Sequence, residues 1–171
     1  MASFASAQAL RQVGRFSEAL RELDLSREDS LESQILRAEL LERVGQIGQA
    51  KSLSSSLLVR QRLTPSHKSA CEYVLGRGAL EQGDTDKAIA HFQRSASFAA
   101  ECKDLERLCR SQYLLMMIVS DRSGPDAVAP LLAEVRLSAT KLGDPHTTAA
   151  LHLHVGEMEG RRGMLRSAVH S

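Results

Sequence analysis

The sequence predicts an all-α protein built as a right-handed superhelix, an α-solenoid, of about five antiparallel helix hairpins. Apolar residues recur at three- and four-residue intervals, which is the period of a helix and not of a strand. Runs of Val, Ile and Thr are scarce, so we expect no strand. A glycine followed five residues later by an alanine occurs at five places with near-constant spacing, which is typical of a stacked repeat protein. These pairs are Gly14/Ala19, Gly45/Ala50, Gly83/Ala88, Gly124/Ala129 and Gly163/Ala168.

The first two hairpins are assigned to residues 1–27 and 28–64. In the first, we expect helices over Ala2–Val13 and Phe16–Asp24. In the second, the apolar periodicity predicts helices over Leu31–Val44 and Ile47–Arg62. Thr64-Pro65 then ends this unit, because proline cannot continue a helix but starts one well.

The third hairpin, in residues 65–103, has the clearest pattern. Apolar residues between Ser69 and Leu80 lie on one helical face, and Gly83 suits the left-handed end of that helix. Asp84 or Thr85 then caps the next helix. The small residues Gly76 and Ala88 are expected to let the two helices approach closely.

The fourth and fifth hairpins are assigned to residues 104–143 and 144–171. In the fourth, we expect helices over Leu105–Asp121 and Asp126–Leu142, with Pro130 either kinking the second helix or delaying its start. In the fifth, we expect helices over His146–Gly160 and Met164–His170, the last one incomplete. Because a repeat cannot bury its apolar face alone, two hypotheses follow: the chain is a piece of a longer protein, or this end self-associates with another copy.

The pattern of the third hairpin resembles the tetratricopeptide repeat family. That family has a leucine-glycine pair before the turn, a turn glycine, a small residue early in the second helix and an aromatic four positions on. Leu75-Gly76, Gly83, Ala88 and Phe92 match in order, and Val155-Gly156, Gly163 and Ala168 match in the fifth unit. The other units keep mainly the glycine and the alanine. Spacings near 40 exceed the usual period of about 34 and resemble the longer variants found in regulators and adaptors.

The composition restricts the functions to be considered. The 171 residues fit one domain over residues 1–171, and 22 Lys and Arg against 21 Asp and Glu give a charge of +1, so we do not expect nucleic acid as a partner. The three cysteines form no CxxC pair, and the amino terminus has no signal peptide pattern. The richest apolar stretch, Tyr113–Val119, is too short to span a membrane. We therefore expect a cytoplasmic protein that binds no membrane.

Candidate catalytic and metal-binding residues are few. His154 and Glu157 are three apart, which is a weak metal pattern, and Cys71 follows His67 by one helical turn but lies on the predicted core face. No acid, base and nucleophile converge. We expect no enzyme, no cofactor and no metal.

The resemblance implies a partner-binding groove lined by the first helix of each hairpin. Placing the inward positions by each unit's glycine gives an apolar strip edged by charges, which suits a peptide or an amphipathic helix of a partner protein. The candidate groove residues are Ile35, Glu39, Glu42, Arg43, Tyr73, Arg77, Glu81, Leu114, Ile118, Asp121, Arg122, Glu157 and Arg161. An alternative is that Ile35, Leu114 and Ile118 are simply buried between neighbouring helices.

Two functions remain open at this point. The preferred one is a non-enzymatic interaction module that binds a protein segment on its concave surface. The alternative is a sensor or regulatory segment of a larger signalling ATPase or transcription regulator.

Overall fold

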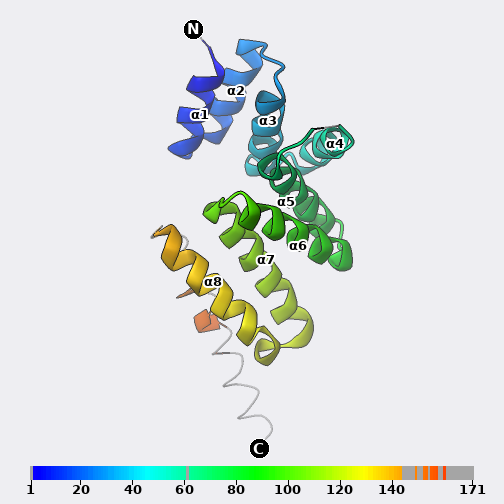
Figure 1. Cartoon of the computed structure of the whole chain (residues 1–171), viewed down its shortest axis with the longest axis vertical. Helices are drawn as coiled ribbons and strands as arrows, with labels where there is room; N and C mark the ends of the chain where they lie inside the picture. Colours follow the sequence, from blue (N-terminus) through cyan, green and yellow to red (C-terminus); the bar gives the residue numbers. More distant parts are fainter. Residues whose placement is uncertain are drawn as a thin grey trace, which may run out of the picture.

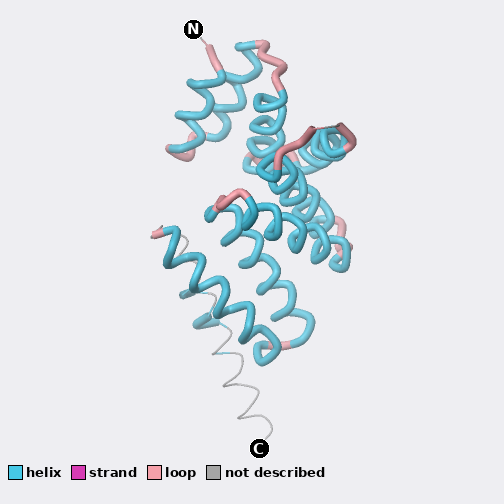
Figure 2. The backbone as a smooth tube through the Cα atoms, in the orientation of Figure 1, coloured by secondary structure: helices cyan, strands magenta, loops and turns pink. Residues whose placement is uncertain are grey.

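The structure is a computed structural model that describes residues 2–60, 62–143, 149, 152, 153, 155–157 and 160. Within these residues the chain is helical, has no strand and forms an all-α solenoid (Figure 1), and Figure 2 shows short loops between the helices. The stack curves, with α1 and α8 on the same side of the view. The helices are α1 (Phe4–Gln12), α2 (Phe16–Ser26), α3 (Leu31–Arg43), α4 (Ile47–Leu58), α5 (Pro65–Glu81), α6 (Thr85–Glu101), α7 (Leu105–Ser123), the 3₁₀ turn η1 (Pro125–Val128) and α8 (Ala129–Leu142).

The first helix of each of the first four hairpins begins at a hydrogen-bonding cap. The side chains of Ser3, Ser30, Thr64 and Asp104 each accept from a backbone N–H three residues later, at 3.1, 3.2, 3.3 and 3.0 Å respectively. Such caps satisfy amides that have no partner within the helix. They fix the start of α1, α3, α5 and α7, the helices that line the candidate site.

The turn inside each of the first three hairpins is the same. Gly14, Gly45 and Gly83 have φ of +77°, +81° and +75°, which L side chains rarely adopt. Each glycine N–H donates to the carbonyl three residues earlier, and the next N–H donates to the carbonyl five residues earlier. This repeated hydrogen-bonded helix end turns the chain back on itself.

Small residues lie where the paired helices touch. Ala19, Ala50 and Ala88, five residues after the turn glycines, are fully buried. Gly76 faces the buried ring of Phe92, because a Cβ placed on Gly76 would lie 2.7 Å from Phe92 Cε1. The close packing predicted at Gly76 and Ala88 is thus confirmed, and Ala19 and Ala50 are buried in the same way in the first two hairpins.

Two predictions about the helices are corrected. Ala129 is exposed and Val128, 1% exposed, takes the core position, because η1 delays the helix and moves the register by one residue. Of the two alternatives for Pro130, the delayed start is right, since α8 begins at Ala129. The predicted helix to Arg62 ends earlier, at Leu58, where the chain leaves helical geometry.

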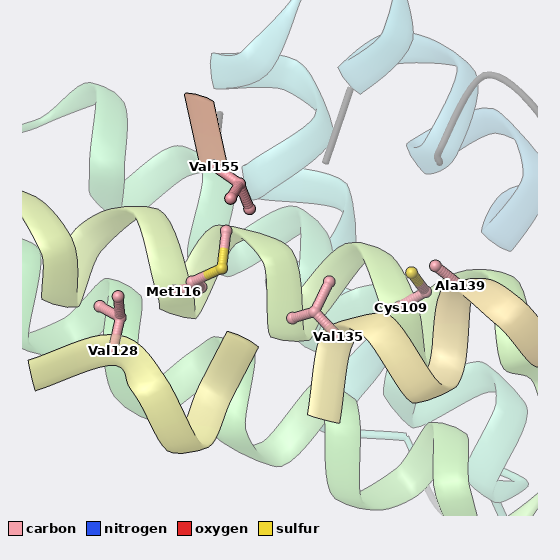
Figure 3. Packing of buried hydrophobic residues seen from close by; sticks show 6 residues of the cluster. All are labelled: Cys109, Met116, Val128, Val135, Ala139 and Val155. Atoms are coloured by element: carbon pink, nitrogen blue, oxygen red, sulfur yellow. The ribbon is translucent and has the colours of Figure 1, made fainter. Parts of the chain in front are cut away.

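The hydrophobic core runs along the stack as a chain of clusters. The one in Figure 3 lies between α7 and α8 and contains Val155, which is 7% exposed. The residues described between 149 and 160 are helical, and Val155 among them packs on the fourth hairpin. The predicted Met164–His170 helix, and Ala168 with it, lies outside the described residues.

Buried serines add polar contacts between the helices of the third and fourth hairpins. Ser69 Oγ donates to the Ser95 carbonyl and Ser95 Oγ donates to the Ser69 carbonyl, both at 2.9 Å. Ser111 Oγ on α7 donates to Ser95 Oγ at 2.9 Å. The three hydroxyls thereby join α5, α6 and α7 without an unsatisfied donor.

Candidate functional site

The first helices α1, α3, α5 and α7 share one surface, and charged side chains connect them there. α3 contacts α1 and α5, and α5 contacts α7. We call the connected side chains the inner ion-pair cluster. Its members are Arg11, Glu39, Glu42, Arg43, Arg77, Asp104, Glu106, Arg107 and Arg110.

Glu42 lies at the centre of three arginines. Its carboxylate side chain is 7% exposed and accepts from Arg77 Nε at 3.0 Å and from Arg110 Nη2 at 3.5 Å. Arg43 Nε lies 3.9 Å from the same carboxylate. One buried negative charge on α3 therefore holds guanidinium groups from α3, α5 and α7.

Tyr73 connects this group of charges to the core. Its side chain is 5% exposed, and its ring lies 5.7 Å from that of Phe92 at an interplanar angle of 59°. Arg110 Nη2 donates to the Tyr73 hydroxyl at 2.9 Å, and the Arg110 guanidinium lies 4.3 Å from the ring centroid. A cation over an aromatic face is attracted by the ring, so Tyr73 fixes Arg110 beside Glu42.

Arg107 forms the second centre of the cluster. It is 8% exposed, pairs with Glu39 and lies 3.3 Å from Asp104. Burial alone would lower the pKa of Arg107, but the carboxylates of Glu39 and Asp104 outweigh it and raise the pKa. Arg107 is therefore a permanent positive charge held by carboxylates of α3 and of its own helix cap.

Ion pairs also join hairpins that are distant in the sequence. Arg11 of the first hairpin lies 3.7 Å from Glu39 and 3.8 Å from Glu106 of the fourth. Arg43 of the second hairpin lies 3.5 Å from Glu106, and Arg110 lies 3.9 Å from it. Glu106, in the first turn of α7, thus contacts arginines of both the first and the second hairpin.

The inner ion-pair cluster contains five arginines and four carboxylates, an excess of one positive charge. Burial, and then the charge of Arg110, lower the pKa of Arg43. Arg43 still remains protonated at neutral pH, because the ordinary pKa of arginine is far above 7. The surface is therefore a fixed arrangement of charges of both signs.

The structure brings five of the candidate groove residues together in this cluster or against it: Glu39, Glu42, Arg43, Tyr73 and Arg77. Glu81, Asp121 and Arg122 lie apart from it, at the carboxyl ends of α5 and α7, and are exposed. Arg122 there pairs with Asp86 of α6.

The apolar candidates are mostly core residues. Ile35 is 8% exposed and packs with Leu57 and Ala70, and Ile118 is 6% exposed and packs with Leu115. Leu114 is half-buried against the same cluster as Ile118. Burial between neighbouring helices, the alternative interpretation, therefore describes Ile35 and Ile118. Glu157 is exposed on a helical segment, and Arg161 lies outside the described residues.

Sequence reasoning missed five members of the cluster: Arg11, Asp104, Glu106, Arg107 and Arg110. Inward positions were counted back from each turn glycine, and α7 has 19 residues, so the count from Gly124 reached only the second half of that helix. The spacing of Arg107, Arg110 and Leu114 on one helical face was the available signal.

The structure has two pockets here, and part of the cluster lines the first of them. One pocket of about 410 Å³ lies toward the amino-terminal ends of the helices. Its lining is Phe4, Gln8, Arg11, Glu32, Ile35, Leu36, Glu39, Ser66, His67, Ala70, Asp104, Glu106 and Arg107. A second pocket of about 650 Å³ lies where α5 and α7 end. Its lining is Leu80, Gly83, Asp84, Thr85, Asp86, Ile118, Asp121 and Arg122.

The described residues offer little for catalysis or metal binding. No group of three His, Cys, Asp or Glu side chains suited to a metal ion occurs among them. Burial raises the pKa of the Cys71 thiol to about 12, and Glu39 adds to the increase. A thiol with so high a pKa stays protonated at neutral pH, and only the thiolate is nucleophilic. Cys71 is therefore a core side chain and not a nucleophile.

Solved structures with similar folds decide the fold type. The chain resembles the crystal structure of putative kinesin light chain nearly identical TPR-like repeats from Podosopora anserina, with a TM-score of 0.61 and 20% identity over 98% of this chain and 88% of that one. The crystal structure of a single-substitution variant of the same repeats gives a TM-score of 0.58 and 19% identity over 96% of this chain and 90% of that one. The fold is that of the tetratricopeptide repeat.

The tetratricopeptide-like fold agrees with the resemblance found in Leu75-Gly76, Gly83, Ala88 and Phe92. At 20% and 19% sequence identity the similarity establishes the fold alone, and no binding partner is inferred from it. No protein-family model matches the sequence, and the search of curated proteins gives no match.

A tetratricopeptide-like helix pair is amphipathic, with one polar side. In the part of the chain that the structure describes, no helix combines the length and the apolar content needed to cross a bilayer.

Proposed function

We propose that the chain is a non-enzymatic interaction module that binds a peptide or a helix of a partner protein on the surface formed by α1, α3, α5 and α7. The observation that carries the proposal is the shared surface of these helices, with a fixed cluster of charges that lines part of one pocket and a second pocket where α5 and α7 end. A segment lying across the helices would contact the cluster and both pockets. We place this activity in the cytoplasm, consistent with the three free cysteines.

The charges support a protein segment as ligand. The four carboxylates of the cluster already neutralise most of the charge of its five arginines, so the excess of one positive charge is small for binding a nucleic-acid phosphate backbone. Fixed charges of both signs favour one orientation of a bound segment, and wrong partners meet like charges. The apolar side chains in both pockets supply the contact area.

The test compares two charge-swapped proteins in pull-downs from extract of the source cells. The groove variant carries Glu81→Lys and Arg122→Glu, exposed positions at the ends of α5 and α7. The control carries Glu101→Lys and Arg60→Glu, exposed positions at the ends of α6 and α4. Both keep the net charge of the wild type.

We expect a partner retained by the wild type and by the control to be lost by the groove variant, with helicity and unfolding temperature equal in all three. Equal capture by the two variants would contradict binding on this surface. Loss with the control alone would move the binding surface to the second helices.

A further inference from the structure

The exposed carboxylate of Glu106 lies among three arginines that come from three different hairpins. Arg43 Nη2, Arg11 Nη2 and Arg110 Nη1 lie 3.5, 3.8 and 3.9 Å from its oxygens. A charge-assisted bond between a guanidinium and a carboxylate is normally about 2.7–2.9 Å long. Glu106 is 48% exposed, so it is a loosely held counter-ion in contact with water.

The carboxylate of Glu42 does not complete the charge balance of these arginines. Its close bond, of 3.0 Å, goes to Arg77 Nε. Arg110 Nη2 and Arg43 Nε lie 3.5 and 3.9 Å from it. The short bond of Arg110 is to the Tyr73 hydroxyl, at 2.9 Å, and this group is neutral. Burial, and then the charge of Arg110, lower the pKa of Arg43, which is the effect of like charges held close together.

The carboxylates of Glu39 and Asp104 are also engaged elsewhere. Glu39 pairs most closely with the buried Arg107 and lies 3.7 Å from Arg11 Nε. Asp104 lies 3.3 Å from Arg107 as well. Around Glu106, three positive charges therefore face one negative charge at distances longer than a close ion pair.

We propose that Arg11, Arg43 and Arg110 bind a glutamate or aspartate side chain of the partner segment, and that Glu106 occupies this position in the free protein. We call these three residues the arginine site. This inference rests on the proposed function and assigns the chemistry of the partner. The arginine side chains are 32%, 33% and 20% exposed respectively, so the surface gives access to each guanidinium.

Geometry and solvation favour the exchange of one carboxylate for another. A guanidinium forms two parallel bonds to a well-placed carboxylate, and this arrangement is stronger than the long contacts that Glu106 makes. Exposed ion pairs are weak, so the side chain of Glu106 turns into water at little cost. Arg11 and Glu106 also line the pocket of about 410 Å³, in which the half-buried ring of Phe4 offers apolar contact to neighbouring side chains of the segment.

The charges of the arginine site argue against other partner segments. A basic segment would bring a further positive charge to three arginines, and like charges across an interface cost binding energy. A segment without charge would leave the arginines with Glu106 as before and gain nothing from them. An acidic side chain is the group that the arginine site fits.

Fluorescence anisotropy tests the inference with a labelled helical peptide of leucine and glutamate, and with a matched peptide in which glutamine replaces glutamate. The first variant, Glu106→Gln, removes the competing carboxylate and keeps the size of the side chain. Its control is Glu18→Gln, because Glu18 is 47% exposed and also pairs with an arginine, but on the second helix of its hairpin. The second variant is Arg43→Gln. Its control is Arg37→Gln, on the same helix, since Arg37 is 30% exposed and pairs with Asp24.

We expect Glu106→Gln to bind the glutamate peptide about threefold to tenfold more tightly than the wild type does, the range that exposed charge contacts supply. Arg43→Gln should bind it more weakly by a similar factor, and each control should stay within about twofold of the wild type. The glutamine peptide should not distinguish the five proteins. Because the decisive expectation is a gain of binding, a variant that fails to fold does not produce it.

Three results would overturn the inference. Equal tightening in Glu18→Gln and Glu106→Gln would show general charge attraction. Unchanged or weaker binding by Glu106→Gln, with helicity and Tm equal to those of the wild type, would show that Glu106 does not compete with the ligand. No binding of the glutamate peptide to any of the proteins would also overturn it, although a partner retained by the wild type in pull-downs would then leave the proposed function standing.

Discussion

Replacing Glu42 with glutamine tests the inner ion-pair cluster. The substitution keeps the size of the side chain and removes the charge that Arg77 and Arg110 share and that Arg43 approaches at 3.9 Å. Breaking a fully buried ion pair by removing one partner costs about 3–5 kcal/mol. The side chains of Arg43, Arg77 and Arg110 are 33%, 37% and 20% exposed respectively, so water screens part of the positive charge left behind. We therefore expect Glu42→Gln to lower the free energy of unfolding by about 2 kcal/mol.

Urea unfolding followed by circular dichroism at 222 nm measures this change. For a chain of this size, about 2 kcal/mol corresponds to a fall in Tm of roughly 4–8 °C. The control is Asp24→Asn, which removes a carboxylate that is 57% exposed and paired with Arg37, and should change the free energy by less than about 0.5 kcal/mol. If Glu42→Gln unfolds at the same urea concentration as the control, the cluster does not stabilise the packing of the hairpins.

Three other substitutions or conditions test the fold itself. Gly76→Ala should lower the free energy of unfolding by about 1–3 kcal/mol, because its Cβ would lie 2.7 Å from the buried ring of Phe92. In thermal unfolding, adding Phe92→Leu to the same chain should recover part of this loss. An unchanged Tm for Gly76→Ala would show that the ring moves freely. Gly83→Ala should cost about 1 kcal/mol in urea unfolding, because the φ of +75° strains an L side chain; no loss would mean that the turn readjusts. With a pKa raised to about 12, Cys71 should react with a thiol reagent at pH 8 far more slowly than the half-buried Cys102. Between pH about 8.5, the pKa of the thiol in the unfolded chain, and pH about 12, its pKa in the folded chain, only the unfolded state loses the Cys71 proton. The free energy of unfolding should therefore fall as the pH rises through this range, and Cys71→Ala should reduce that fall. An unaltered fall in the variant would contradict a buried thiol.

Much of the fold followed from local rules in the sequence. Gly14, Gly45 and Gly83 marked the turns, because each needs a positive φ that other residues avoid. The alanines five residues later marked the contacts between paired helices, and all three are buried. Such signals act over a few residues, so a single sequence reveals them.

The fourth hairpin shows where local rules fail. The same glycine-alanine spacing occurs at Gly124 and Ala129, but a 3₁₀ turn shifts the register, and Val128 is buried instead. Pro125 and Pro130 carried the information that the helix start differs, but the sequence did not decide between a kink and a delay.

The candidate site was only partly predictable for a different reason. Counting back from the turn glycines picked out Glu42, Tyr73 and Arg77, and these three lie in the inner ion-pair cluster or against it. Arg110, the partner of Glu42 and Tyr73, and Arg107, the partner of Glu39, lie on another hairpin, in the first half of a longer helix. How far α7 reaches across α3 depends on the curvature of the whole stack, which no short pattern encodes.

Site-specific photo-crosslinking tests the central claim, that the surface of the first helices binds a protein segment. A photoreactive phenylalanine analogue replaces Glu81 at the end of α5 in one protein and Glu101 at the end of α6 in another, both exposed positions. After irradiation in extract of the source cells, we expect one discrete adduct from position 81 and none from position 101. An adduct from position 101 alone would contradict binding on the first helices and place the binding surface on the second helices.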